Sequence, residues 1–269
     1  NGGITLTNGT IKNGTLSTSS TFNVQAGLVE AILAGTGNLN KTGPGSITLS
    51  GQNSFSGGLS ISDGSLTLTG INTYAGNNTV NGGILQVSGQ GTLGSTENAL
   101  FINGGIVDLG STAQVLNGGI TLSGGTIRNG ILASSSTFNV QQGNIDAQLT
   151  GSGSLIKTTN GEVILSTQNT YTGATNIISG TLTSSTLNSL SPNSAFTIGT
   201  NATLNIGGFN QSIGSLSGNG FVSNFGLENA ILTVGNDNTN TLFSGIIQDD
   251  AATGLTKTGS GTLTLTGLN

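Results

Sequence analysis

The stretch from Asn1 to Lys41 begins NGGITLTNGTIKNGTLSTSSTFNVQ and ends LNK, and it returns from Asn117 to Lys157 as NGGITLSGGTIRNGILASSSTFNVQ, ending LIK. The two copies lie 157 − 41 = 116 positions apart. A shorter period lies inside this one, because glycines and aliphatic residues recur 19 positions apart. They are Gly51, Gly70 and Gly89; Ile47, Leu66 and Leu85; Leu49, Leu68 and Val87. Periods near 20 residues are typical of solenoids.

The composition fits a stack of short turns better than one globular core. Charged residues make up 6% and aromatic residues 4% of the chain, while 47 of 269 residues are glycine, over twice the usual share of about 7%. Disordered chains lack periodic aliphatic residues, so we expect a folded chain. We predict one solenoid over residues 1–269, with a long repeat at 1–67 and 117–183 and a third, partial repeat copy at 254–269.

Charge and cysteine content exclude several classes of function. The net charge is −5 and the pI is about 4.2, so the chain lacks the cationic surface that nucleic acid requires. The absence of cysteine excludes disulfides and thiolate metal sites. The sequence starts at Asn1 without a signal peptide and stops inside a repeat, so we expect a fragment of a longer parent.

Alternation of aliphatic residues with Ser or Thr predicts strands with one buried face. The clearest cases are residues 47–50, 66–69, 204–206 and 263–266. Asn and Gly accept positive φ, so they predict sharp turns between the strands. These turns are expected at 13–14, 81–83, 103–105 and 117–119. Helix is expected to be nearly absent.

The spacing decides between hairpins and a parallel coil. In a parallel coil, equivalent residues stack one full turn apart, and Ile61 over Val80, Phe55 over Tyr74 and Gly64 over Gly83 follow a 19-residue step. A turn of about 19 to 22 residues suits three short strands plus corners. We therefore predict an all-β, right-handed parallel β-helix of about 13 turns, its hand following the usual chirality of crossovers.

Three stretches carry a resemblance to a known family. They read KTGPGSITLSGQNSFSG from Lys41, LTKTGSGTLTLTG from Leu255, and QNTYTG from Gln168, with Lys157-Thr158 starting the middle copy. They resemble the autotransporter-associated β-strand repeat of bacterial passenger domains, also called the passenger-associated transport repeat, whose usual form runs LTKTGxGTLTLSGxNTYTGGTTVNGGTL. Thr159-Asn160 replaces Gly-x in the middle copy.

The resemblance implies a passenger β-helix that is exported through a C-terminal translocator β-barrel of the same parent chain. Such a passenger is displayed at the outer-membrane surface of a Gram-negative bacterium, or released from it. The implied role is that of a secreted virulence-associated adhesin or its stalk. Host-surface protein, host glycan or a second copy of the passenger are the partners it implies, with no cofactor.

Candidate catalytic residues were sought among the acids, because the chain has no histidine for a catalytic triad or an imidazole metal site. The acids are Glu30, Asp63, Glu97, Asp108, Asp146, Glu162, Glu228, Asp237, Asp249 and Asp250. β-Helices that cleave polysaccharides place two or three carboxylates on neighbouring turns, whereas Asp63 is expected to face Gly82 or Gly83. The Asp249-Asp250 pair is interpreted as a solvated corner loop, with cation binding or catalysis as the alternative. Asn236-Asp237-Asn238 is also interpreted as a loop, with calcium binding as the alternative. We expect no catalytic, cofactor or metal site and no enzyme activity.

Other recurring residues have a structural and a functional interpretation. Outward Thr-x-Thr pairs such as Thr67 and Thr69 could match ice, but Gln86 and Ser88 break the array on the next turn. The aromatic residues Phe55, Tyr74 and Tyr171 could stack on sugars or pack in corners. The repeat lysines, Lys41, Lys157 and Lys257, are expected to cap a strand edge or a corner.

Three functions remain open from the sequence. The favoured one is a structural segment of a surface-displayed passenger, acting as spacer, export scaffold and adhesin stalk. A carbohydrate-binding or carbohydrate-cleaving β-helix of the tailspike type is the alternative, and an ice-binding array is the remote one.

Overall fold

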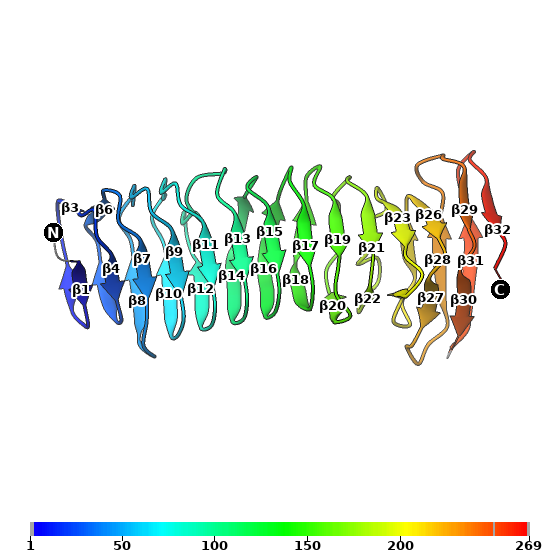
Figure 1. The fold of residues 1–269 in the computed structure, drawn as a ribbon, viewed down its shortest axis with the longest axis horizontal. Helices are drawn as coiled ribbons and strands as arrows, with labels where there is room; N and C mark the ends of the chain where they lie inside the picture. The colour runs from blue at the N-terminus through cyan, green and yellow to red at the C-terminus, as the bar shows by residue number, and fades with distance from the viewer. Residues whose placement is uncertain (1–2, 250, 268–269) are drawn as a thin grey trace. The chain divides into compact units, whose positions relative to one another are not determined.

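The chain divides into two compact units, Asn1–Ala133 and Ser134–Asn269. The computed structural model describes residues 3–249 and 251–267. Within them every regular element is a strand, and no helix is present that could cross a membrane. The strands pair in parallel and stack turn on turn (Figure 1), which makes a β-solenoid of about 13 turns. The predicted fold class is confirmed, and the right hand of the coil stays a prediction.

In the first unit each turn contributes one strand to each of two parallel sheets. The first sheet contains β1 (Ile4–Leu6), β4 (Phe22–Val24), β7 (Leu39–Lys41), β9 (Leu59–Ile61), β11 (Asn78–Val80), β13 (Leu100–Ile102) and β15 (Ile120–Leu122). The second sheet contains β2 (Thr10–Ile11), β5 (Gly27–Val29), β8 (Ser46–Leu49), β10 (Ser65–Leu68), β12 (Ile84–Val87), β14 (Ile106–Val115) and β16 (Thr126–Ala133). β3 (Thr15–Ser17) pairs with β6 (Ile32–Ala34).

The second unit is built in the same way. Its first sheet contains β17 (Phe138–Val140), β19 (Leu155–Lys157), β21 (Thr175–Ile177), β23 (Ala195–Ile198), β26 (Ser215–Gly218), β29 (Thr241–Phe243) and β32 (Leu263–Leu265). Its second sheet contains β18 (Gly143–Thr150), β20 (Glu162–Leu165), β22 (Gly180–Ser184), β24 (Ala202–Asn205), β27 (Phe221–Asn224) and β30 (Ile246–Asp249). A third sheet contains β25 (Gln211–Ile213), β28 (Ala230–Val234) and β31 (Thr253–Lys257).

The third side of a turn, which follows the strand of the second sheet, differs from the prediction of three strands per turn. At residues 51–55 and 70–75, for example, the chain has no assigned strand. Backbone groups there are paired across turns by isolated hydrogen bonds, such as Thr73 N–H to the Asn53 carbonyl at 2.9 Å. Most turns in the described residues therefore have two regular strands and a third, irregular side.

Turn length varies more than the predicted 19 to 22 residues. Leu59 pairs with Asn78, 19 positions later, but Phe22 pairs with Leu39 after 17. Near the end of the second unit Gly218 pairs with Phe243, 25 positions later. The short turn loses residues at the corner between its two sheets, since Val24 and Val29 are 29 − 24 = 5 positions apart whereas their partners Lys41 and Leu49 are 49 − 41 = 8 apart. The long turn gains residues elsewhere, and the parallel pairing of the sheets is kept in both cases.

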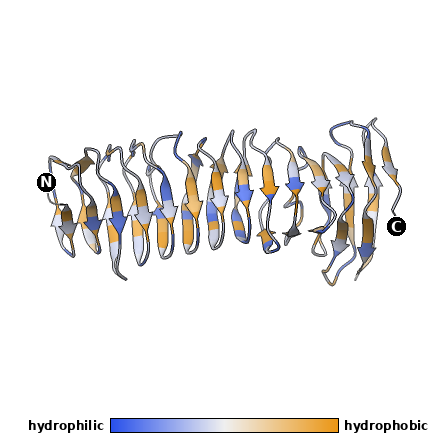
Figure 2. Cartoon of the chain, viewed as in Figure 1, coloured by the Kyte–Doolittle hydropathy of each residue, from blue (hydrophilic) through white to orange (hydrophobic). Residues whose placement is uncertain are grey.

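The interior is made of stacked aliphatic ladders, as predicted. Leu66 pairs with Ile47 on one neighbouring turn and with Leu85 on the other, and all three are at most 1% exposed. The adjacent ladder of Leu49, Leu68 and Val87 is fully buried. Figure 2 shows hydrophobic residues alternating with hydrophilic ones along many strands. This alternation keeps one face of each strand in the core.

Candidate functional site

The acids do not converge on one site. Among residues 3–249 and 251–267 no three Asp or Glu residues lie close enough to hold a metal ion. Glu30 forms an exposed ion pair with Lys12 at 3.8 Å. Asp63 lies beside Gly83 of the next turn, as predicted, where its own carboxylate accepts a hydrogen bond from the Gly64 N–H at 2.7 Å.

Asp108 is the acid with the most elaborate surroundings. Its carboxylate is nearly buried and accepts hydrogen bonds from Arg128 Nε at 2.9 Å, Asn129 Nδ2 at 3.0 Å and the Gly110 N–H at 3.0 Å. Burial acts to raise the pKa of this carboxyl, but the hydrogen bonds and the Arg128 charge outweigh burial, so the pKa lies below its ordinary value. The cluster fixes the irregularity between β14 and β16, where the register shifts after Asp108.

The two predicted acidic loops have different outcomes. Asp237 lies in a turn, where its Oδ1 accepts hydrogen bonds from the Thr239 N–H at 3.0 Å and the Thr239 hydroxyl at 2.7 Å. This supports the loop interpretation of residues 236–238. Asp249 is the last residue of β30 and pairs with Asn224, so placing it in a loop was wrong. Asp250 lies outside the described residues.

Lys41 is a buried cation in an otherwise aliphatic ladder. It stands between Val24 and Ile61 on the inward face of the first sheet and is fully buried. Its ammonium reaches the corner, where it donates to three backbone carbonyls. These are Thr42 at 3.1 Å, Gly43 at 2.6 Å and Asp63 of the next turn at 3.0 Å. Burial lowers the pKa of Lys41, and the nearby Asp63 carboxylate acts in the opposite direction.

Lys157 repeats this arrangement in the second unit. It is fully buried, and its ammonium donates to the carbonyls of Thr159 and, at 3.0 Å, of Ser179 on the next turn. Burial lowers the pKa of Lys157 to about 8. Ser179 occupies the position equivalent to Asp63, so Lys157 lacks the acidic neighbour of Lys41. The prediction that these lysines cap a corner is confirmed.

Lys257 behaves differently although the sequence around it is alike. It ends β31 and pairs with Val234 in the third sheet, whereas Lys41 and Lys157 lie in first sheets. Its side chain is exposed and donates to the carbonyls of Thr258 and Gly259 of its own corner. The third repeat copy therefore occupies a different side of the solenoid from the other two.

Side-chain amides hold the third side together in the first unit. Asn53 accepts a hydrogen bond from the Leu33 N–H of the preceding turn at 3.0 Å and donates to Asn72 Oδ1 of the next at 2.8 Å. Asn72 in turn donates to the carbonyls of Gly70 at 2.8 Å and Thr92 at 3.0 Å. Both amides are buried. This amide ladder satisfies backbone groups that lack a regular strand partner.

The repeat aromatic residues pack inside the turns, and the sugar-stacking alternative for them is wrong. Phe55 and Tyr74 stack with ring centroids 4.8 Å apart and are at most 1% exposed. Tyr171 is fully buried and lies 6.1 Å from the Phe138 ring. The Tyr74 hydroxyl donates to Asn78 Oδ1 at 2.6 Å. Burial raises the pKa of both tyrosines above the ordinary value, so they are hydrogen-bonding structural groups.

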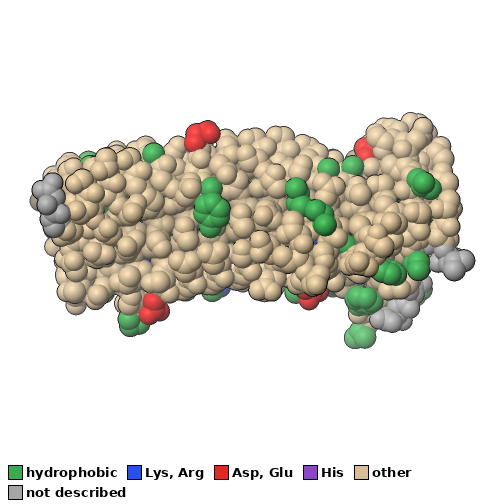
Figure 3. All heavy atoms as spheres, in the orientation of Figure 1, with side chains coloured by type: hydrophobic (Ala, Val, Ile, Leu, Met, Phe, Trp, Pro, Cys, Tyr) green, Lys and Arg blue, Asp and Glu red, His purple; other side chains and the backbone are tan. Residues whose placement is uncertain are grey.

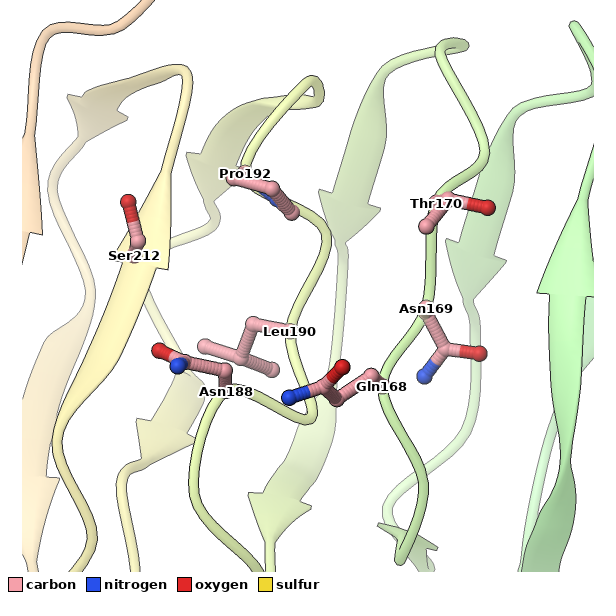
Figure 4. Close-up of a pocket in the computed structure, with 7 residues that line it drawn as sticks. All are labelled: Gln168, Asn169, Thr170, Asn188, Leu190, Pro192 and Ser212. Atoms are coloured by element: carbon pink, nitrogen blue, oxygen red, sulfur yellow. The ribbon is translucent and has the colours of Figure 1, made fainter.

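One hollow of about 290 Å³ opens on the third side of the second unit (Figure 4). Three consecutive turns line it, with residues Gln168, Asn169, Thr170, Asn188, Leu190, Pro192 and Ser212. Asn169 is buried and fully engaged, since it accepts from the Leu149 N–H and donates to the Thr167 and Ser189 carbonyls. None of the lining residues carries a charge.

The outer surface is mainly polar and uncharged. In the view of Figure 3, backbone and uncharged polar side chains cover most of the face, with scattered hydrophobic side chains and a few isolated acidic ones. The outward Thr67 hydroxyl donates to Gln86 Oε1 of the next turn at 3.3 Å. A glutamine therefore interrupts the threonine row here, as the sequence predicted.

Comparison with known proteins identifies the recurring pattern. The family profile Passenger-associated-transport-repeat matches residues 39–67, 63–87, 155–183 and 255–269. These segments contain all three lysine corners and the Asn53 and Asn72 amides. The chain carries passenger-associated transport repeats. The predicted resemblance is thus confirmed.

A curated relative agrees with the transport repeats. The chain is 31% identical over 184 residues to the Adhesin BmaC autotransporter of Brucella suis biovar 1 (strain 1330), and the match covers 65% of this chain. The chain spans about 5% of that relative's length. No solved structure matches the chain. Together these findings support an autotransporter passenger with repeats.

Sequence reasoning missed the amide ladder and the hollow. The signal for the ladder was present in the transport repeat, as the spacing Gly51-x-Asn53-x-Phe55 recurs at Gly70-x-Asn72-x-Tyr74. An asparagine two residues after a glycine is usually a turn residue, and only the parallel stacking shows that it points inward. The hollow has no comparable signal.

Proposed function

We propose that the chain is a structural segment of a surface-displayed autotransporter passenger, serving as a spacer, an export scaffold and part of an adhesin stalk. In the parent, a C-terminal translocator β-barrel would carry it across the outer membrane and anchor it there, unless it is released. No catalytic step belongs to this proposal, and the matched relative is named an adhesin.

One observation carries the proposal. The side chains that recur in the transport repeat are engaged in holding one turn to the next. Lys41 and Lys157 cap corner carbonyls, Asn53 and Asn169 bridge three turns, and the aromatic rings are buried. A repeat whose lysine, asparagine and aromatic residues hold neighbouring turns together in two of its copies is suited to extending a stack, because each turn offers the next a set of partners.

The long repeat permits a direct test. Deleting residues 42–157 joins Lys41 to Thr158 and removes 157 − 41 = 116 residues while keeping a Lys-Thr pair at the junction. The chain would be displayed by fusion to an autotransporter barrel, and surface exposure measured by antibody labelling and protease accessibility on intact cells. A spacer tolerates this shortening, so display should remain close to that of the full chain.

A matched control deletes residues 42–151, which removes a number of residues that does not restore the register. This variant should lose folded display, because a turn out of register exposes its buried faces. If the in-register deletion abolishes display as completely as the control, the chain is not a modular spacer.

A further inference from the structure

We propose that the hollow on the third side of the second unit is a binding site for one uncharged sugar ring of a glycan. The proposal goes beyond the spacer role and does not depend on it, since it rests on the geometry around Gln168, Asn188 and Ser212.

The hollow arises where the second copy of the long repeat departs from the first. In the first unit Gly70 passes so close to Gly51 that a Cβ on Gly70 would lie 2.3 Å from the Gly51 carbonyl oxygen. The equivalent residues of the second copy are Thr167 and Thr186, whose side chains forbid that approach. Asn188, the equivalent of Asn72, leaves the amide ladder and takes φ +54°, while the Ser189 carbonyl replaces it as acceptor for Asn169.

The rim of the hollow carries three polar side chains that bind no other group of the described chain. Gln168 and Asn188 are exposed, Ser212 is half-buried, and none of their side chains has a hydrogen-bond partner in the described part of the chain. In Figure 4 the Gln168 amide extends toward the segment that carries Leu190, and the Asn188 amide extends toward the strand that carries Ser212. Amides and hydroxyls offer both donors and acceptors, which is what a sugar hydroxyl needs.

Two of the lining residues are apolar. Leu190 is fully buried and forms part of the floor, and the half-buried Pro192 contributes its ring. Thr170 turns its hydroxyl away from these residues in Figure 4. A small apolar surface beside two amides suits the C–H face of a sugar ring, whose hydroxyls project at its edge.

The size of the hollow and the lack of charge in its lining restrict the kind of ligand that it can bind. A volume of about 290 Å³ is at the lower end of the usual range for small-molecule pockets, about 300 to 1,000 Å³, so it admits one ring. The lining holds no charged side chain to pair with a sulfate, a carboxylate or an ammonium group. The ligand is therefore a neutral sugar, such as a terminal or branching residue of a glycan.

The test uses the purified 269-residue chain and four neutral disaccharides, lactose, maltose, cellobiose and diacetylchitobiose, titrated in ¹H–¹⁵N NMR spectra. At least one should bind saturably with a Kd on the order of 1 mM, with shifts confined to residues 168–170, 188–192 and 212. The double variant Gln168→Ala/Asn188→Ala should bind about tenfold more weakly. Both side chains are exposed, so its thermal unfolding should match that of the unmodified chain.

Gln52→Ala is the matched control, because Gln52 is the exposed equivalent of Gln168 in the first copy, where Asn53 and Asn72 close the third side. It should bind as the unmodified chain does. Saturation by none of the four sugars, shifts away from the hollow, or equal weakening by both variants would overturn the proposal. Selective binding of a tripeptide of neutral residues in place of the sugars would also overturn it.

Discussion

The turns that follow Lys41 and Lys157 belong to the same long repeat, yet they end in different structures. After Lys41 the amide ladder continues through Asn53 and Asn72, and the Phe55 ring stacks on Tyr74. After Lys157 the ladder passes from Asn169 to a backbone carbonyl, no aromatic residue follows Tyr171 at the equivalent position, and a hollow opens. The two sheets are specified by the aliphatic residues that stack along them. The third side, in contrast, depends on how closely the backbones of adjacent turns can approach each other.

The largest expected effect is the loss of stability when a buried leucine of the second sheet, a feature that both regions share, is truncated. Leu49 and Leu165 are equivalent, fully buried ladder residues of the second sheets. Leu49→Ala and Leu165→Ala should each lower the free energy of unfolding by about 2–5 kcal/mol, because each leaves a cavity. Urea denaturation measures this, with the outward, half-buried Thr48→Ala as control. A loss below about 1 kcal/mol at either leucine would show that its ladder is not closely packed.

The two regions differ on the third side of the turn, at Asn72 and its equivalent Asn188. Asn72 is buried and bonded to Asn53, Gly70 and Thr92, so Asn72→Ala should lower the free energy of unfolding by about 1–3 kcal/mol through unpaired buried groups. The equivalent Asn188 is exposed and outside the ladder, so Asn188→Ala should change it by less than about 0.5 kcal/mol. Equal losses in thermal or urea unfolding would contradict the divergence of the two third sides.

A smaller effect concerns the lysine corners. The Asp63 carboxylate raises the pKa of Lys41 against the effect of burial, and Ser179 replaces it beside Lys157. Asp63→Ser should therefore lower the pKa of Lys41, and Ser179→Asp should raise that of Lys157. Titration of the lysine Cε and Nζ signals by NMR measures both. The explanation fails if the two exchanges leave both titrations unchanged.

The last prediction concerns the pH dependence of stability. The pKa of Lys157 is about 8 in the folded chain, against 10.5 ordinarily, so between these values the unfolded chain binds more protons. The free energy of unfolding of the second unit should then rise from pH 8 to pH 10.5, as the cost of burying the charge disappears. Lys157→Met should reduce this slope, and Lys257→Met, at an exposed position, serves as control. An unchanged slope in Lys157→Met would contradict the assignment.

The sequence predicted the parts of the fold that repeat at a fixed step. Inward positions such as Leu66 and Leu68 follow from alternation, and the corner role of Lys41 follows from its recurrence beside a Gly-rich turn. The third side was less accessible, because a strand is recognised by alternation and this side is held by single side chains such as Asn53. Three strands per turn were therefore expected where most turns have two.

The candidate site could not be predicted for a related reason. Alignment of the long repeat places Asn188 on Asn72, which suggests equal roles. We attribute their different positions to the bulk of Thr167 and Thr186, which stand on adjacent turns 186 − 167 = 19 positions apart in place of two glycines. The same limitation explains Lys257, since nothing near it in the sequence shows that its strand pairs in the third sheet.

The ammonium of Lys41 reaches a carbonyl 22 positions later, on a turn that is completed after its own. A slip in the pairing of Leu59–Ile61 with Leu39–Lys41 would move that carbonyl away and remove one of the three acceptors of a buried charge, which is costly. The buried lysine therefore makes the correct register of the next turn more stable than a slipped one. In a chain that folds one turn at a time, this preference would act before a further turn is added.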